Sequence, residues 1–388
     1  MIHVFIRVFS PALAASTGFV QSRWRCRLRA VRLAVLPVVL LLGISHNPAE
    51  AECAQPRPCT STPQDLGTLG GDWARVFGVS DDGAVVVGMS AIGAAIPGEH
   101  HAFRWTKTGM ADLSPMPKGI TSEATGISGD GKLVSGSTQV AFGTPRTTVW
   151  TSDGMSQFPT KSDSYAQGVS HDGSVIVGAG NIGDPFDRVL HAFRWSSAGE
   201  GRDLGTLGGT YGTAAAASRN GSVIVGTATN SKGAYRAFRW TEAGMVDLGT
   251  LGGQIATATG VNADGSVVVG ASFPANNSDV HAFRWTSAGI VDLGTLGGSL
   301  SSANAVSSDG EVVLGLSQIA GSSEYHAFRW TKATGMQDLN TQLTKAGIEM
   351  AGITLLEAVA ISGNGEFIVG SAAFSGKQGR AFILRFVD

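Results

Sequence analysis

The sequence is poor in charged residues, in aromatic residues and in cysteine. The balance of charge and the pattern of the residues that are present exclude several classes of protein. Charged residues make up 15% of the 388 residues and aromatic residues 7%, while 28 basic and 30 acidic residues leave a net charge of -2. Binding to nucleic acid through phosphate contacts needs an excess of positive charge, so no nucleic-acid partner is expected. The 54 glycines follow no triplet repeat, which excludes collagen, and 43% apolar residues exclude a disordered chain.

The N-terminal segment differs in composition from the rest of the chain. Five arginines between residues 23 and 32 precede an apolar run over residues 33–44, and Ala49-Glu50-Ala51 then offers a small-x-small cleavage pattern. This order is typical of a secretory signal peptide, here residues 1–51. The apolar run is shorter than the roughly 20 residues of a membrane span, so an uncleaved anchor is the weaker alternative. We therefore expect an exported chain, whether periplasmic, at the cell surface or secreted, with no integral membrane domain after cleavage.

Removal of residues 1–51 takes away six arginines and one glutamate, which leaves 22 basic and 29 acidic residues and a net charge of -7. The segment 52–64 that follows carries Cys53 and Cys59. In an oxidising compartment two cysteines so close in sequence are predicted to form a disulfide. A metal site would need two further ligands that no nearby His or Cys supplies, so neither a metal nor a cofactor is expected.

A repeat of 45 residues dominates the chain from residue 65 to residue 388. Six tryptophans keep this period: Trp105, Trp150, Trp195, Trp240, Trp285 and Trp330. Asp-Gly or Asn-Gly pairs separate short β-branched or aromatic runs seven times, which predicts seven β-hairpins. A second turn follows each His-Ala-Phe-Arg-Trp-like strand, so each unit is expected to have four strands, A to D.

Seven four-stranded units of this length predict an all-β fold, a seven-bladed β-propeller over residues 65–388. The segment 65–69 resembles a strand D, and the seventh unit ends after its strand C. The N-terminal strand is therefore expected to complete the last blade and close the ring, giving a monomer without open sheet edges. The alternative is a β-solenoid, which needs no exchange of a terminal strand.

The repeated residues have structural roles in the first place. Phe103 and Trp105 alternate with Arg104, so the aromatic side chains are expected in the core and the arginine on the other face of strand C. We expect a repeated contact, within a blade or between blades, of this arginine with the aspartate that begins the Asp-Leu segment, such as Asp112. The glycine that ends each strand B, such as Gly88, predicts a close approach or a bend.

One repeated position carries a candidate binding function, because the residue that opens strand C is basic in every unit. A ring of such residues predicts attraction for an anionic ligand, such as a sugar acid, although hydrogen bonding to nearby loops is the structural alternative. The ring consists of His101, Arg146, His191, Arg236, His281, His326 and Arg380.

The sequence shows no catalytic constellation: no paired glutamates, no Ser-His-Asp spacing and no HExxH motif. The B–C loops differ among the units, as in residues 91–99, 180–189 and 273–280, which places recognition on their face. We therefore expect a binding or interaction module, with a glycan or an envelope protein as partner, or a structural surface module. A carbohydrate-active hydrolase or lyase with its site in the central funnel is the alternative.

The repeated motifs also resemble a known family. His-Ala-Phe-Arg-Trp, Asp-Leu-Gly-Thr-Leu-Gly-Gly and the Ser-x-Asp-Gly-x-Val-Val-Gly hairpin are similar to the bacterial HAF repeat, over residues 65–388. Asp338-Leu339-Asn340 and an insertion before Glu357 resemble that family's last repeat. Two positions depart from the pattern: Thr147 to Trp150 in the second unit, and Leu384 in place of tryptophan. The resemblance implies export and implies no chemistry.

Overall fold

The computed structural model describes part of the 388-residue chain: residues 60–93, 98–114, 119–140, 143–159, 163–183, 189–275 and 277–387. The predicted signal peptide over residues 1–51 lies outside these residues, as does the predicted disulfide between Cys53 and Cys59. No helix within the described residues is long and apolar enough to cross a membrane.

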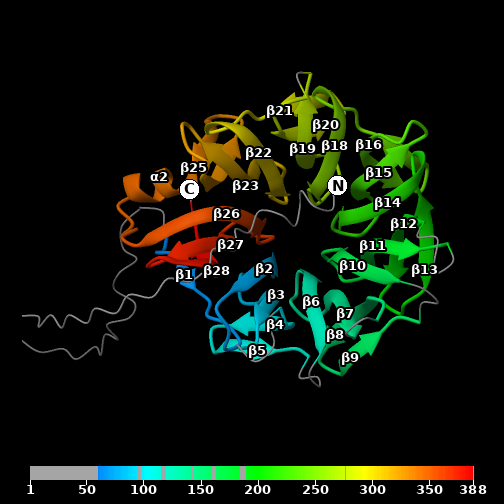
Figure 1. Ribbon diagram of the computed structural model, residues 1–388, viewed down its shortest axis with the longest axis horizontal. Helices are drawn as coiled ribbons and strands as arrows, with labels where there is room; N and C mark the ends of the chain where they lie inside the picture. Colours follow the sequence, from blue (N-terminus) through cyan, green and yellow to red (C-terminus); the bar gives the residue numbers. More distant parts are fainter. Residues whose placement is uncertain are drawn as a thin grey trace, which may run out of the picture. The chain divides into compact units, whose positions relative to one another are not determined.

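The described residues form 28 strands, arranged as seven four-stranded antiparallel blades around a common axis (Figure 1). Five blades are separate sheets, and the other two are joined into one sheet by a parallel bridge between Leu190 and Tyr211. The chain is therefore the seven-bladed β-propeller that the repeat predicts, and the β-solenoid alternative is wrong. We number the blades 1 to 7 along the chain.

The inner two strands of each blade come from one hairpin. Strand A, nearest the axis, is β2 (Ala74–Val79), β6 (Ile120–Ile127), β10 (Ser164–Val169), β14 (Gly208–Ala217), β18 (Gly252–Val261), β22 (Gly297–Val306) and β26 (Ile353–Ile361). Strand B is β3 (Val86–Ala91), β7 (Val134–Val140), β11 (Val175–Asn181), β15 (Ile224–Asn230), β19 (Val268–Pro274), β23 (Val312–Ile319) and β27 (Phe367–Phe374).

The outer two strands carry the His-Ala-Phe-Arg-Trp-like and Asp-Leu segments. Strand C is β4 (His100–Thr106), β8 (Arg146–Thr151), β12 (Leu190–Ser196), β16 (Tyr235–Thr241), β20 (His281–Thr286), β24 (Tyr325–Thr331) and β28 (Lys377–Arg385). Strand D is β5 (Gly109–Asp112), β9 (Gly154–Gln157), β13 (Gly201–Gly205), β17 (Gly244–Asp247), β21 (Gly289–Asp292), β25 (Gly335–Asp338) and, for blade 7, β1 (Gln64–Asp65).

The A–B hairpins owe their shape to the Ser-x-Asp-Gly sequence. In blade 1 the Ser80 hydroxyl donates to the Asp82 carboxylate at 2.8 Å and accepts from the Val85 N–H at 3.0 Å. Asp82 also accepts from the Ala84 N–H, and these two hydrogen bonds, the backbone one foremost, lower the pKa of the carboxyl. Gly83 has φ +70°, which only glycine adopts without strain. The predicted hairpins are confirmed.

A tight approach between strands A and B explains the glycine that recurs in strand B. A Cβ on Gly315 would lie 2.0 Å from the carbonyl oxygen of Ser302 and 2.8 Å from the Phe328 ring. The same distance to the strand A carbonyl is between 1.8 and 2.0 Å at the other six positions: Gly88, Gly136, Gly178, Gly226, Gly270 and Gly370. Each strand A also has a β-bulge just after this point. The predicted close approach is confirmed.

The aromatic residues of strand C fill the spaces between blades. Phe103 is fully buried and Trp105 is 5% exposed. They pack against Val369 and Ala381 of blade 7, so each blade contributes aromatic side chains to the core that it shares with the preceding blade. Their predicted place in the core is confirmed.

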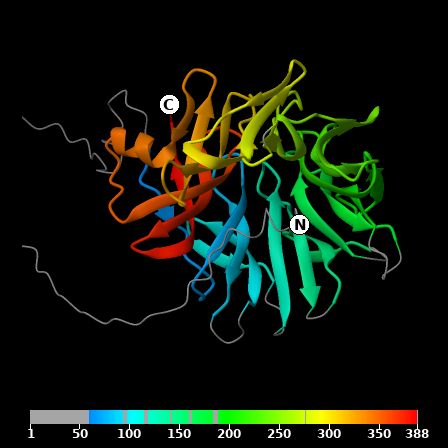
Figure 2. The ribbon, with the colours of Figure 1, turned by 45° about the horizontal axis from the view of Figure 1, so that its top comes forward.

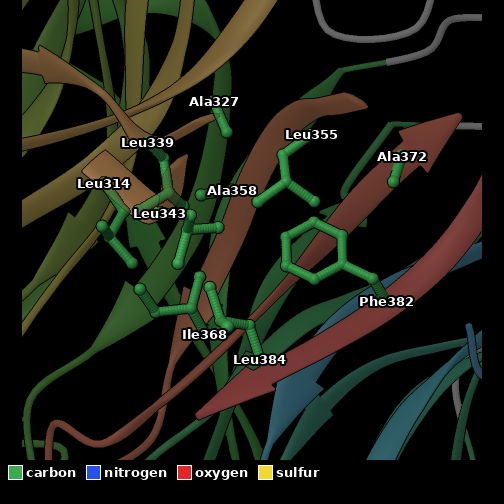
Figure 3. Close-up of a cluster of buried hydrophobic side chains, with 10 residues drawn as sticks. All are labelled: Leu314, Ala327, Leu339, Leu343, Leu355, Ala358, Ile368, Ala372, Phe382 and Leu384. Atoms are coloured by element: carbon green, nitrogen blue, oxygen red, sulfur yellow. The ribbon is translucent and has the colours of Figure 1, made fainter. Parts of the chain in front are cut away.

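The insertion before the last blade contains a helix that the sequence pattern did not predict, α2 (Leu339–Lys345). Asp338 caps its N-terminus by accepting from the Asn340 N–H. Leu339 and Leu343 are fully buried in a cluster between blades 6 and 7 that also contains Leu384 (Figure 3). The helix therefore supplies apolar volume beside the position where blade 7 has leucine and six other blades have tryptophan.

The ring is closed by β1, which pairs antiparallel with β28 through Asp65 opposite Phe382 (Figure 2). The Leu66 N–H donates to the Ala381 carbonyl at 3.0 Å, and an Arg380–Asp65 ion pair of 3.0 Å adds to the contact. Closure by the N-terminal strand is confirmed. The strand itself is Gln64–Asp65, whereas the sequence predicted residues 65–69, because the Thr-Leu-Gly-Gly segment forms the turn toward blade 1.

We expect Gly315→Ala to lower the free energy of unfolding by about 3 kcal/mol, because the added methyl group meets a backbone carbonyl that only a shift of strand A could move. Chemical denaturation measures the loss. The exposed Ser287→Ala change in a C–D turn serves as control. Equal stabilities of the two variants would contradict the steric explanation.

Deletion of residues 52–66 removes the fourth strand of blade 7 and exposes the edge of β28. We expect a lower and broader thermal transition and a tendency to aggregate, because blades 1 and 7 lose their shared strand. Replacing Cys53 and Cys59 by serine should change the transition much less, since that segment precedes β1. A truncated protein that melts like the intact one would show that closure depends on other contacts.

Candidate functional site

The predicted basic ring lies at the start of strand C, and most of its members contact the aspartate of strand D in the same blade through a side-chain nitrogen. The His101 Nδ1 lies 2.7 Å from the Asp112 carboxylate and donates to it. Equivalent pairs are His191–Asp203 at 2.8 Å, Arg236–Asp247 at 3.7 Å, His281–Asp292 at 2.7 Å, His326–Asp338 at 2.9 Å and Arg380–Asp65 at 3.0 Å. In blade 2 the strand D position holds Gln157, whose amide donates to Thr138.

The second oxygen of each aspartate holds the turn that leads to the next blade. The Asp203 Oδ1 accepts from the Gly205 N–H at 2.7 Å, and Asp292 accepts from the Gly294 N–H in the same way. One carboxylate therefore fixes both a basic side chain and a backbone turn. The ring as an anion site stays a prediction, and an anion would compete there with a carboxylate already in place.

The predicted pairing of the His-Ala-Phe-Arg-Trp arginine with this aspartate is wrong. Asp112 is opposite Phe103 in the strand register, and Arg104 is opposite Ala111, so arginine and aspartate lie on opposite faces of the sheet. The arginine instead reaches the next blade: Arg284 donates to the Gly310 carbonyl at 3.1 Å.

The inner wall of the ring carries a second set of equivalent residues, which we call the polar ring. Each is the strand A residue whose carbonyl approaches the strand B glycine: Arg75, Glu123, Tyr165, Thr213, Thr257, Ser302 and Glu357. All except Thr213 are partly exposed. Strand A is covered by strand B on one edge and by the neighbouring blades on both faces. Its other edge faces the axis, so water reaches these side chains from there.

Charge gathers on three adjacent blades of the polar ring, because blades 7, 1 and 2 contribute Glu357, Arg75 and Glu123. The Asn304 amide donates to the Glu357 carboxylate at 2.9 Å. Burial raises the pKa of Glu357, and the Asn304 hydrogen bond and the Arg75 guanidinium offset this only in part. The His100 Nε2 lies 3.4 Å from the Glu123 carboxylate, while its Nδ1 donates to the Gly98 carbonyl.

Aromatic side chains lie one step further toward the B–C and D–A loops, the end of the ring that we call the mouth. Trp73 precedes β2, and its carbonyl accepts from the Ala91 N–H, so the strand alternation continues and places Trp73 on the same side as Arg75. The Arg75 guanidinium lies 6.0 Å from the centre of the Trp73 ring. The centre of the His100 ring lies 5.8 Å from that of the Trp73 ring. Tyr211 holds the same position in blade 4.

The opposite end of the ring, which carries the A–B hairpins, is narrow, and we call it the hub. Residues of successive hairpins are joined by backbone hydrogen bonds: Asp81 to Gly129, Gly129 to His171, Asp172 to Arg219, Arg219 to Ala263, Ala263 to Ser308 and Asn364 to Asp81. The His171 Nε2 of blade 3 lies 2.5 Å from the Asp81 carboxylate of blade 1. The Arg219 guanidinium lies 3.1 Å from His171 Nδ1. Because a guanidinium donates and cannot accept, Nδ1 is the acceptor, and the histidine proton is on Nε2, which faces Asp81.

The sequence analysis did not identify the polar ring, because its members share a place in the fold and no residue type. One signal was present. Trp73 is the only tryptophan after residue 51 that stands outside the 45-residue series. Within the described ranges no three His, Cys, Asp or Glu side chains are grouped to hold a metal ion.

The protein is thus a closed seven-bladed β-propeller whose inner wall carries a ring of polar side chains. The β-propeller domain of the Trilobed protease from Pyrococcus furiosus is similar to it over 81% of this chain and 95% of that chain, with a TM-score of 0.51 and 8% identity. That domain has an open velcro topology. In this chain β1 pairs with β28.

Two TolB structures are also similar. TolB from Acinetobacter baumannii matches over 78% of this chain and 80% of that chain, with a TM-score of 0.44 and 14% identity. A putative TolB from Agrobacterium tumefaciens matches over 72% and 94%, with a TM-score of 0.44 and 13% identity. No family model and no curated protein matches the chain. At sequence identities this low, the similarity to these structures concerns the fold alone. Membership of the HAF-repeat family stays a prediction.

The His326–Asp338 pair makes stability depend on pH. The hydrogen bond that His326 donates to Asp338 and the charge of Asp338 raise the pKa of His326, although burial acts against this. A raised histidine pKa stabilises the fold fully below the unfolded pKa of about 6.5, and the contribution is lost as pH rises through the folded pKa. We therefore expect His326→Gln to lower the melting temperature by about 2 °C at pH 5.5 and by less at pH 9. Thermal scans at both values test this, with exposed Thr334→Ala as control, and a gap that widens at pH 9 would contradict it.

Proposed function

We propose that this chain is an exported binding module that takes its ligand at the mouth of the propeller, over the polar ring. One observation carries the proposal. Blades that repeat one another in hairpin, core and turn differ at the polar ring, where three adjacent blades place Glu357, Arg75 and Glu123 side by side.

The two ends of the ring support the same proposal. At the hub, hairpin residues are held to one another by backbone hydrogen bonds and by the His171–Asp81 contact, which leaves little room for a ligand. At the mouth, the B–C loops vary in length and sequence, as residues 91–99, 180–189 and 273–280 show. Variable loops on a rigid repeated scaffold are where recognition is placed most easily.

The proposed export rests on the N-terminal segment and on the resemblance to the HAF repeat. A basic stretch, a short apolar run and Ala49-Glu50-Ala51 precede the propeller, and the part after residue 51 carries a net charge of -7. An acidic chain in the cell envelope or outside it meets glycans and envelope proteins. We take these as the candidate partners.

The test expresses the full sequence in a Gram-negative host and follows where it goes. We expect the protein outside the cytoplasm with an N-terminus at residue 52, as read by N-terminal sequencing. The purified protein should bind an envelope fraction, and Arg75→Ala together with Glu357→Gln should weaken that binding at least tenfold. Lys132→Ala and Lys332→Ala, exposed on the hub side, are the controls. Cytoplasmic retention, or binding that the mouth variants leave unchanged, would refute the proposal.

A carbohydrate-active hydrolase or lyase is the second candidate, and one observation favours it. Glu123 and Glu357 flank Arg75, and the raised pKa of Glu357 suits a general acid with a second carboxyl group nearby. This function predicts release of new sugar ends from envelope glycans, and it predicts that Glu357→Gln binds its glycan without cleaving it. Intact glycan after prolonged incubation with the unmodified protein would exclude it.

A further inference from the structure

We propose that the ligand at the mouth is a saccharide that carries no acidic group, held by the polar ring and by Trp73. This inference rests on the proposed function, since it takes the mouth as the binding site, and it adds the chemical class of the ligand. Three features of the inner wall carry it: its hydrogen-bonding groups, its aromatic faces and its charge.

Every member of the polar ring has a side chain that hydrogen-bonds. A guanidinium, two carboxylates, one phenol and three aliphatic hydroxyls lie at one level around the axis. This mixture of donors and acceptors matches sugar hydroxyls, which both donate and accept. An apolar ligand would displace water from these groups and offer no hydrogen bonds in exchange, at a cost that grows with burial.

Thr213 adds an independent observation. Its side chain is only 9% exposed, and its Oγ1 makes no hydrogen bond to any of the described residues. Buried hydroxyls in folded proteins are nearly always bonded, so the Thr213 hydroxyl needs a partner that the described residues do not supply. Thr213 is in blade 4, directly below Tyr211 on the same strand, so the unsatisfied hydroxyl and an aromatic ring are neighbours.

The aromatic faces suit the apolar side of a sugar ring. Trp73 lies above Arg75 at the mouth and is partly exposed, and Tyr211 occupies the equivalent place in blade 4. Tyr211 and Tyr235 are in edge contact with ring centres 5.5 Å apart. Burial raises the pKa of Tyr211, so its hydroxyl keeps its proton and remains a donor. Sugars present C–H faces between their hydroxyls, and a ring beside hydrogen-bonding groups satisfies both parts.

The charged sector of the polar ring does not favour acidic sugars. Its one guanidinium, Arg75, is flanked by the Glu123 and Glu357 carboxyl groups, and burial raises the pKa of Glu357. Six of the basic residues at the start of strand C already have an aspartate partner. A sugar acid would have to compete with Glu123 and Glu357 for the Arg75 guanidinium, whereas a neutral or amino sugar would not.

A purely structural role for these residues makes a different prediction. If Arg75, Glu123 and Glu357 served only to join blades, their replacement would lower stability and leave any glycan binding unchanged. Trp73→Ala and Thr213→Val separate the two roles, because each alters a group at the mouth. A melting temperature within about 2 °C of the parent shows that the fold is retained. If Trp73→Ala fails to fold, Trp73→Phe takes its place.

The experiment presents the purified protein, made from the full sequence, to an array of neutral, amino and acidic glycans, and then titrates the best binder by tryptophan fluorescence. We expect binding to neutral or amino glycans, at least tenfold weaker in Trp73→Ala and several-fold weaker in Thr213→Val, with Lys332→Ala unchanged. A preference for acidic glycans, or affinities unaffected by both mouth variants, overturns the inference.

The two proposals fail in different ways. If mouth variants abolish binding to the envelope fraction while no glycan on the array binds, the mouth is a binding site and its ligand is not a saccharide, so this inference alone is wrong. If envelope binding ignores the mouth variants, the proposed function itself is wrong.

Discussion

Close approach of two backbones, repeated in every blade, is the constraint on which the rest of the structure depends. The strand A carbonyl at the polar ring comes so near strand B that only glycine fits opposite, from Gly88 in blade 1 to Gly370 in blade 7. The bulge that follows turns strand A beside the axis. The same contact therefore sets the geometry of the blade and brings seven side chains to one level on the inner wall. The close approach of strand A to strand B therefore determines both the shape of the blades and the position of the candidate site.

Much of the fold could be predicted because its determinants are local and repeated. The 45-residue tryptophan series, the Asp-Gly hairpins and the incomplete last unit led to seven blades closed by the N-terminal strand. The exceptions have physical reasons. Helix α2 is a short insertion without a repeat to reveal it, and only its buried Leu339 and Leu343 explain why blade 7 needs no tryptophan. The mistaken Arg–Asp pairing came from ignoring strand register, since residues paired across a ladder share a face.

The candidate site was harder to predict for the same reason that the fold was easy. Repetition draws attention to what stays the same, and the basic ring was chosen because it recurs. Six of its seven members are engaged with Asp112 and its equivalents, which recur with them. The residues that distinguish the blades, such as Arg75 and Glu357, are of different types. They are recognised as equivalent only once the structure places their strands around one axis. Trp73, outside the tryptophan series, was the one visible sign.

The hub has a consequence for how such a protein changes over evolutionary time. Genes built from near-identical units gain and lose copies readily by unequal recombination, and a ring of six or eight blades would be the natural product. Here Asp81 and His171 occupy the space left by Gly129 and Gly363, where any side chain would collide with them. The hairpin tips of blades 1, 2, 3 and 7 are thus matched to one another. A unit duplicated or lost among these blades would set other residues against the Asp81 and His171 side chains, so a few atoms at the centre make the ring sensitive to the copy number of the repeat.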